Sequence, residues 1–204
     1  MRIIAGEFRS RRLKTPGDSL RPTSDRLRET LFDVLGDSVA GSVWLDCYAG
    51  TGAVGLEALS RGASQAIFIE QAHGSLRILD DNIASLGVDD RTRVFNGTVE
   101  HGLRRLAREG LCPDPVSGSC RLGRSMPGFI FIDPPYQEIE EYQRTLGLLE
   151  SLPLVDVQTL VIAEHDRRLP TPDPQRATTN VRARLRRVRL LEQGDSALSF
   201  YRLE

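Results

Sequence analysis

Short apolar segments alternate with helix-forming segments along most of this chain, and that alternation limits the possible folds more than any other feature. Each apolar run is typical of a buried strand, and leucine, isoleucine and valine recur at helical spacing between the runs. Strands that alternate with helices build a parallel sheet with right-handed crossovers. We expect strands at 43–46, 66–70, 93–95, 129–132 and 159–164, and helices at about 24–35, 53–60, 76–86, 99–109 and 138–149.

Both ends of the chain are predicted to add β-structure. Residues 184–191 and 197–203 indicate two strands joined by a Gly-Asp turn, one of them antiparallel to the sheet. Residues 2–6 and 11–14 predict a short basic hairpin. A lone hairpin is marginally stable, so this one should pack on the domain or be ordered by a nucleic acid. We therefore expect a hairpin extension at 1–20 and one α/β domain at 21–204, with an inserted loop at 111–128.

The net charge of −1 conceals two clusters of basic residues. The first 28 residues contain eight Lys or Arg against three Asp or Glu, and five arginines lie between positions 182 and 189. Such clusters on a near-neutral protein suggest a polyanionic partner. Solvated arginine is the alternative, because Lys14 is the single lysine and a GC-rich genome favours arginine. Arg26 and Arg28 fall off the apolar stripe of their helix, so we expect both at the surface, available to phosphates.

Nothing in the sequence predicts a membrane span or a signal peptide, because every apolar run is too short. The three cysteines are an odd number without close pairing, which is typical of a reducing cytoplasm. We expect a cytoplasmic monomer without a metal ion.

The segment from Phe129 to Tyr136 joins a buried strand to a carboxylate, two prolines and an aromatic ring. Prolines lack the N–H that a ladder needs, so the strand should stop at Asp133, with a stiff loop at its carboxyl end. Ligands bind at that edge of open α/β sheets. Asp133 and the Pro134 carbonyl could accept from an exocyclic amino group and localise its lone pair, while Tyr136 stacks on the base. Alone, the motif fits a solvated Pro-rich turn equally well.

A glycine-rich turn follows the first strand of the predicted sheet. Gly50, Gly52 and Gly55 match the dinucleotide motif G-x-G-x-x-G. Asp46, however, ends the strand four residues before Gly50, and a carboxylate there would repel the pyrophosphate that this motif binds. It suits the ammonium and sulfonium of S-adenosylmethionine instead. Glu70, at the end of the next strand, can accept both ribose hydroxyls.

Each of these acids also has a simpler interpretation. Asp46 could be a capping carboxylate, and Glu70 a surface residue at a strand end. Both acids nevertheless lie at the carboxyl ends of adjacent strands beside a glycine-rich turn. Asp46 also disfavours a NAD-dependent oxidoreductase.

Together these motifs resemble the RsmD family, bacterial methyltransferases that modify a guanine N2 in 16S ribosomal RNA. The similarity covers nearly the whole chain, in blocks at 2–6, 20–32, 45–62 and 133–136, of which the second and third are the most specific. It implies a Rossmann-like class I methyltransferase fold. That fold has a seven-stranded, mostly parallel sheet, a C-terminal antiparallel hairpin and an N-terminal β-hairpin extension.

The resemblance also implies roles for individual residues. S-adenosylmethionine would be held by Asp46, Ala49, Gly50, Thr51, Gly52, Glu70 and Thr98, and the target base by Asp133, Pro134, Pro135 and Tyr136. The 16S rRNA, within the small ribosomal subunit, would contact Arg9, Arg11, Arg12, Arg21, Thr23 and Arg26. Thr98 stands where the family often has Asn or Asp, which weakens its adenine contact. Two other functions stay open: adenine-N6 methylation of DNA or RNA, and a non-catalytic nucleic-acid-binding module of the same fold.

Overall fold

The computed structural model describes residues 1–16, 25–110, 126–135, 139–169 and 185–204 of the 204-residue chain. Within these ranges the strands form one seven-stranded sheet in the order β3-β2-β1-β4-β5-β7-β6. The strands are β1 (Val43–Cys47), β2 (Gln65–Glu70), β3 (Thr92–Asn96), β4 (Phe129–Ile132), β5 (Leu160–Asp166), β6 (Leu185–Gln193) and β7 (Ser196–Leu203). Strands β1 to β5 are parallel, and β7 is antiparallel to both of its neighbours. The predicted sheet, with its C-terminal antiparallel hairpin, is confirmed.

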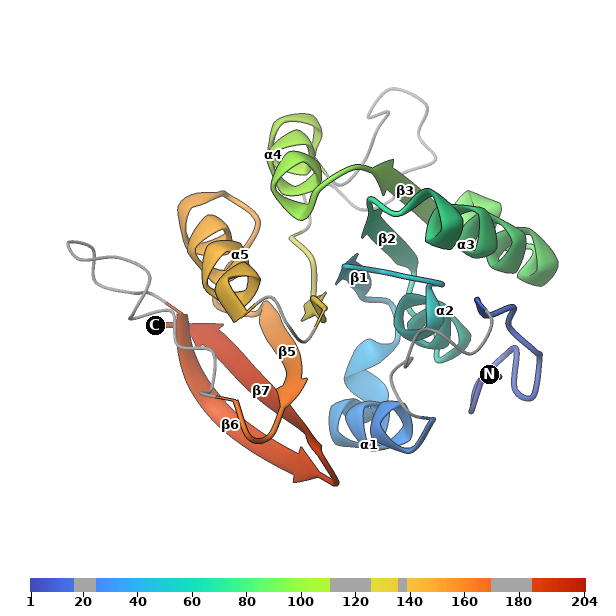
Figure 1. Ribbon diagram of the computed structural model, residues 1–204, viewed down its shortest axis with the longest axis horizontal. Coiled ribbons are helices and arrows are strands. Elements are labelled where there is room, and N and C mark those ends of the chain that lie inside the picture. The colour runs from blue at the N-terminus through green and yellow to red at the C-terminus, as the bar shows by residue number, and fades with distance from the viewer. Residues whose placement is uncertain (17–24, 111–125, 136–138, 170–184) are drawn as a thin grey trace.

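Helices cover both faces of the sheet (Figure 1). One face packs against α1 (Asp25–Leu35), α2 (Ala53–Ser60) and α3 (His73–Leu86), and the other against α4 (Val99–Glu109) and α5 (Ile139–Ser151). Short 3-10 turns, η1 (Gly36–Val39) and η2 (Asp89–Arg91), precede β1 and β3. Alternate residues of each central strand enter opposite cores, so that Trp44 packs towards α1 and Leu45 towards α5. A strand buried on both faces explains why its sequence is apolar without alternation.

The predicted helices and strands of the α/β domain are all present, with ends that shift by three residues or fewer. The predicted insertion at 111–128 lies mostly outside the described residues. Its last residue, Gly128, already pairs with the neighbouring strand β1, because its N–H donates to the Val43 carbonyl at 2.9 Å.

The predicted N-terminal hairpin packs on the domain. Its arms pair through one antiparallel bridge, between Arg2 and Arg12, rather than through two full strands. The pairing stops early because the backbone N–H groups of Ile4 and Ala5 turn away to donate to Glu57 on α2, at 2.8 and 3.0 Å. Ile3 is 0% exposed and lies in the core that α1 and α2 share. The hairpin is predicted either to pack on the domain or to be ordered by a nucleic acid, and in the structure it packs on the domain.

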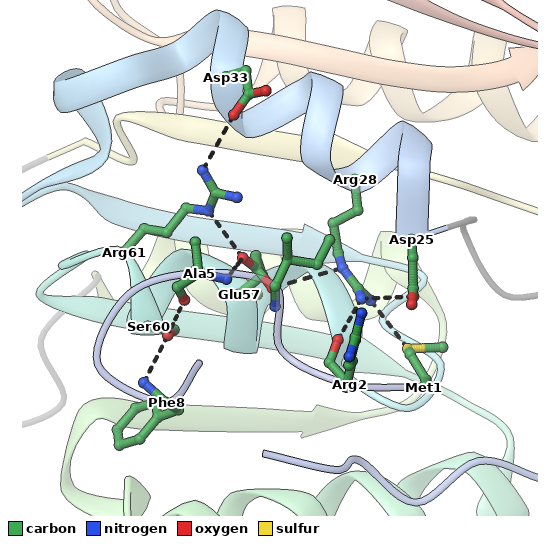
Figure 2. Close-up of polar contacts among 12 residues, drawn as sticks. Met1, Arg2, Ala5, Phe8, Asp25, Arg28, Asp33, Glu57, Ser60 and Arg61 are labelled. Carbon is green, nitrogen blue, oxygen red and sulfur yellow. Dashed lines mark hydrogen bonds and ion pairs between the residues drawn. The ribbon is translucent and has the colours of Figure 1, made fainter. Parts of the chain in front are cut away.

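The prediction that Arg28 lies at the surface is wrong. Figure 2 shows its guanidinium between α1, α2 and the N-terminal segment, and the side chain is 0% exposed. It donates to the Arg2 carbonyl at 2.7 Å and to Asp25 at 3.0 Å, and its Nε lies 3.8 Å from Glu57. Burial lowers the pKa of this guanidinium, against the opposing effect of both carboxylates. The N-terminal segment covers a flank of α1 that helical periodicity assigns to solvent. Arg26 is exposed, as predicted.

Candidate active site

Three neighbouring strands bring the candidate residues to one edge of the sheet. Strand β1 lies between β2 and β4, and Asp46 pairs in register with Phe68 on one side and Phe131 on the other. Glu70 ends β2, and Asp133 follows the last residue of β4. Since adjacent strands lie about 4.8 Å apart, the loop after β1 sits between Glu70 and Asp133. The topology therefore gathers the two acids at the glycine-rich turn.

Asp46 is a buried carboxylate with one hydrogen-bond donor among the described residues. It is 2% exposed, and its Oδ2 accepts from the Gly55 N–H at 3.0 Å. Burial raises the pKa of Asp46 to about 7; the Gly55 hydrogen bond opposes the rise and the charge of Glu70 adds to it. Among the residues that the structure describes, no arginine or lysine forms an ion pair with it. A buried carboxylate with a raised pKa and no basic partner among the described residues favours a ligand that brings a positive charge.

The third glycine of the motif brings helix α2 against the sheet. A Cβ atom on Gly55 would lie 2.4 Å from the Phe68 ring and 3.3 Å from the Asp46 carboxylate. Only glycine allows the helix backbone to approach Asp46 closely enough to donate the hydrogen bond.

Glu70 holds the loop between β1 and α2. Its Oε2 accepts from the Gly50 N–H at 2.7 Å, and its Oε1 accepts from the N–H groups of Gln71 and Ala72. Gly50 and Gly52 adopt left-handed φ angles of +55° and +80°. Glu70 is therefore more than a surface residue at a strand end. A carboxylate offers about four lone-pair positions, so it retains capacity for a further donor.

The other predicted cofactor residues lie along the same loop or beyond β3. Ala49 and Thr51 are 8% and 9% exposed, and the Ala49 N–H donates to the Ile69 carbonyl at 3.0 Å. Thr98 is exposed and is the N-cap of α4, where its hydroxyl accepts from the His101 N–H at 3.2 Å. The structure thus gives the Thr98 hydroxyl a capping role that sequence analysis did not assign.

The predicted base-binding loop begins where β4 ends. Strand β4 ends at Ile132, and Asp133 is half-buried, Pro134 buried and Pro135 exposed. Tyr136 lies outside the described residues, so its stacking role stays a prediction.

Sequence analysis missed Tyr48, which lies between β1 and the glycines. Its φ of +66° is uncommon for a bulky residue. The phenol hydroxyl lies 2.7 Å from the Thr145 hydroxyl and donates to Glu141 at 3.0 Å, both on α5. Burial raises the pKa of this phenol. Strained residues cluster at functional sites. The signal available in the sequence was the position of Tyr48, two residues after Asp46.

Glu164 is a second residue that sequence analysis left without a role. It is 1% exposed and follows Ala163, which pairs with Ile132, so it lies alongside Asp133 at the carboxyl edge. An acid near the carboxyl end of a strand is the same signal that identified Glu70.

The predicted RNA-contacting arginines divide between two elements. Arg9, Arg11 and Arg12 are exposed on the N-terminal segment, and Arg26 is exposed on α1. Arg11 also donates to the Ser85 carbonyl at 2.6 Å, so part of its role is structural. Arg21 and Thr23 lie outside the described residues. Within the described ranges no helix is long and apolar enough to cross a membrane, and no cluster of potential metal ligands occurs.

Comparison with known proteins decides the family. The model of the family described as Conserved hypothetical protein 95 matches residues 1–202. Ribosomal RNA small subunit methyltransferase D of Escherichia coli K12 is 36% identical over 169 residues, which are 81% of this chain and 75% of that protein. The chain belongs to the RsmD family.

Solved structures agree with the fold of this RsmD-family chain. The Escherichia coli protein yhhF superposes with a TM-score of 0.75 at 32% identity, over 100% of this chain and 98% of that one. SMU.776, complexed with SAH in its crystal structure, has a TM-score of 0.63 at 14% identity, over 87% of this chain and 48% of that one. The latter likeness shows the fold alone. The expected Rossmann-like methyltransferase fold is confirmed.

Proposed function

We propose that this RsmD-family protein transfers a methyl group from S-adenosylmethionine to the exocyclic N2 of one guanine in 16S rRNA, within the small ribosomal subunit. One observation carries the proposal: Asp46, a buried carboxylate that has no basic partner among the described residues, lies beside a glycine loop and next to the strand that Asp133 follows. The first feature fits a cationic cofactor, and the second fits an amino group on a base. The protein would act in the cytoplasm as a monomer.

The residues present fit S-adenosylmethionine. Asp46 would face the positive charges of the methionine portion, and Gly50 and Gly52 would let the backbone pass close to it. Glu70 has acceptor capacity left for the ribose hydroxyls, while Ala49, Thr51 and Thr98 would complete the pocket. When bound, the cofactor supplies an electrophilic methyl group.

The target base would bind over the loop that follows β4. Flipping the guanine out of its stack exposes an amino group otherwise hidden in a helix or loop. Asp133 and the Pro134 carbonyl would accept its two hydrogens, with Tyr136 and Pro135 against the ring. Held in this way, the amino nitrogen would present its lone pair for methylation. Positioning of this kind can supply much of the rate enhancement.

The basic side chains would bind the rRNA backbone. Arg9, Arg11 and Arg12 lie on the N-terminal segment, and Arg26 lies on α1. Arg21 and Thr23 complete the proposed set. In this proposal residues 1–20 are an RNA-contacting extension of a methyltransferase domain at 21–204. Phosphate contacts should make binding strongly salt-dependent.

The test is transfer of labelled methyl from S-adenosylmethionine to unmodified small ribosomal subunits, protein-free 16S rRNA and DNA, followed by digestion to nucleosides. We expect label in N2-methylguanosine from ribosomal material. Label in N6-methyladenine, or in DNA alone, would contradict the proposed substrate. Binding of 16S rRNA with no binding of cofactor would indicate a non-catalytic module.

Asp133→Ala should abolish methyl transfer, because it removes an acceptor for the amino group. The affinity for S-adenosylhomocysteine, measured by calorimetry, should change less than about threefold, which is below 1 kcal/mol. Asp133→Asn, which retains one acceptor, is the matched variant and should retain some activity. If Asp133→Ala instead lost the cofactor, Asp133 would belong to the cofactor site.

A further inference from the structure

Asn82 on α3 is a buried amide that joins two parts of the protein. It is 1% exposed. Its Oδ1 accepts from the Lys14 N–H at 2.7 Å, and its Nδ2 donates to the Lys14 carbonyl at 3.1 Å and to the Thr51 carbonyl at 3.0 Å. The amide is therefore fixed in orientation, with its donors towards two carbonyls and its acceptor towards an N–H.

One partner of Asn82 belongs to the proposed cofactor loop. Thr51 stands between Gly50 and Gly52, the two glycines with left-handed backbones. Helix α3 also packs directly on this loop, since a Cβ on Gly52 would lie 2.4 Å from Leu79. A ligand that shifts the loop acts first on α3.

The other partner belongs to the N-terminal segment that carries Arg9, Arg11 and Arg12. Asn82 binds both main-chain groups of Lys14, close to the point where the chain continues towards Arg21 and Thr23. Leu13 of this segment also packs in the apolar core that contains Leu79 and Ile83 of α3. Two further polar contacts between this segment and α3 lie at the surface. They are the Lys14–Asp81 ion pair, with side chains 66% and 55% exposed, and the bond from Arg11 to the Ser85 carbonyl.

We propose that Asn82 is a positioning residue that couples the cofactor loop to the N-terminal segment, so that cofactor binding and RNA binding strengthen each other. The inference rests on the proposed function of both regions. If Thr51 moves when the cofactor binds, Asn82 must follow it or leave a buried donor unpaired, which is unfavourable. By following, it moves the backbone of Lys14. Linkage makes the effect reciprocal.

The experiment measures the affinity for unmodified small ribosomal subunits with and without saturating S-adenosylhomocysteine, in the wild type and three variants. Asn82→Ala removes all three bonds. Asn82→Asp retains the acceptor for the Lys14 N–H but turns a second acceptor towards the two carbonyls. Asp81→Ala is the matched control, because it removes a contact to the same lysine at the surface. Melting curves set an assay temperature at which every variant is folded.

We expect S-adenosylhomocysteine to tighten wild-type RNA binding about fivefold or more, the lower range of typical coupling. The factor should fall towards one in Asn82→Ala and Asn82→Asp and stay unchanged in Asp81→Ala. Hydrogen exchange gives a readout that needs no variant: S-adenosylhomocysteine should slow exchange at the Lys14 amide of the wild type.

Three results would overturn the inference while leaving the proposed function intact. They are a wild type that binds both ligands without coupling, an Asn82→Ala protein that keeps the coupling, and an unchanged rate of exchange at Lys14. A wild type that fails to bind S-adenosylhomocysteine or small ribosomal subunits would overturn the proposed function, and this inference with it.

Discussion

Two buried carboxylates lie at helix α2, Glu57 on the helix itself and Asp46 against its amino end, and they differ in the number of donors around them. Glu57, near the carboxyl end, accepts from the N–H groups of Ile4 and Ala5 and from Arg61 at 2.9 Å, with Arg28 3.8 Å away (Figure 2). Within the described residues Asp46, at the amino end, has one hydrogen-bond donor, the Gly55 N–H. Helix α2 thus separates a well-paired acid, with three donors and two nearby arginines, from a sparsely paired acid with one donor.

This difference separates a structural site from a ligand site. Glu57 and Ser60 fasten the N-terminal segment to the domain: the Ser60 hydroxyl accepts from the Phe8 N–H at 2.9 Å and donates to the Ala5 carbonyl at 2.5 Å. The two arginines beside Glu57 already balance its charge. Asp46 has a raised pKa and, among the described residues, no basic partner, as is typical of binding and catalytic positions.

The largest expected effect comes from substitution of Glu57, the well-paired acid. Glu57→Gln leaves Arg28, which is 0% exposed, without its buried counter-charge, and removing one partner of a buried pair destabilises by about 3–5 kcal/mol. Urea denaturation measures the loss in free energy of unfolding. Asp33→Ala is the control, because it removes the exposed partner of Arg61 and should change stability by about 1 kcal/mol or less. A loss below about 1 kcal/mol for Glu57→Gln would mean that the network does not hold the segment.

The second effect is a pH dependence of stability caused by Asp46, the sparsely paired acid. The pKa of Asp46 is about 7 in the folded protein against 3.8 ordinarily, so the native state binds the extra proton between these values. The contribution of Asp46 to the free energy of unfolding should therefore fall as pH rises from 4 to 7 and stay level above 7. Asp46→Asn should remove the penalty, and its gain over the wild type should grow across this window to at most roughly 4 kcal/mol. The same gain at pH 4 and pH 8 would contradict the assignment.

The third and smallest effect concerns the cofactor. At pH 8, Asp46→Asn should weaken S-adenosylhomocysteine binding about tenfold to hundredfold, because a hydrogen bond to a charged group contributes about 1.5–3 kcal/mol. Isothermal titration calorimetry measures it. In the wild type, affinity should also rise as pH increases through 7, whereas the variant should show no such rise. Equal affinities for the two proteins would remove Asp46 from the cofactor site.

Sequence analysis predicted the sheet well because its rules are local. Apolar runs fix the buried strands, and Pro134 ends β4 by chemistry that no distant contact can change. The adjacency of Asp46, Glu70 and Asp133 follows as soon as the strands are parallel and β1 is central.

The corrections to Arg28 and to the N-terminal hairpin both depend on contacts between distant segments. Arg28 is buried by residues at the N-terminus, and the N-terminal strands shrink to a bridge because Glu57, more than fifty positions away, takes their donors. Helical periodicity carries no information about either. Likewise, the contacts of Asn82 could not be predicted, because only the folded structure brings Lys14 and Thr51 to the same amide.

The most direct test of this account is the pKa of Asp46, measured by carbon-13 NMR of the side-chain carboxyl, with Asp46→Asn to assign the signal. We expect a pKa near 7 in the protein without ligand and a clear fall when S-adenosylmethionine binds, because the cofactor brings positive charge to a buried acid. A value near 4 without ligand, or one that the cofactor leaves unchanged, would contradict it.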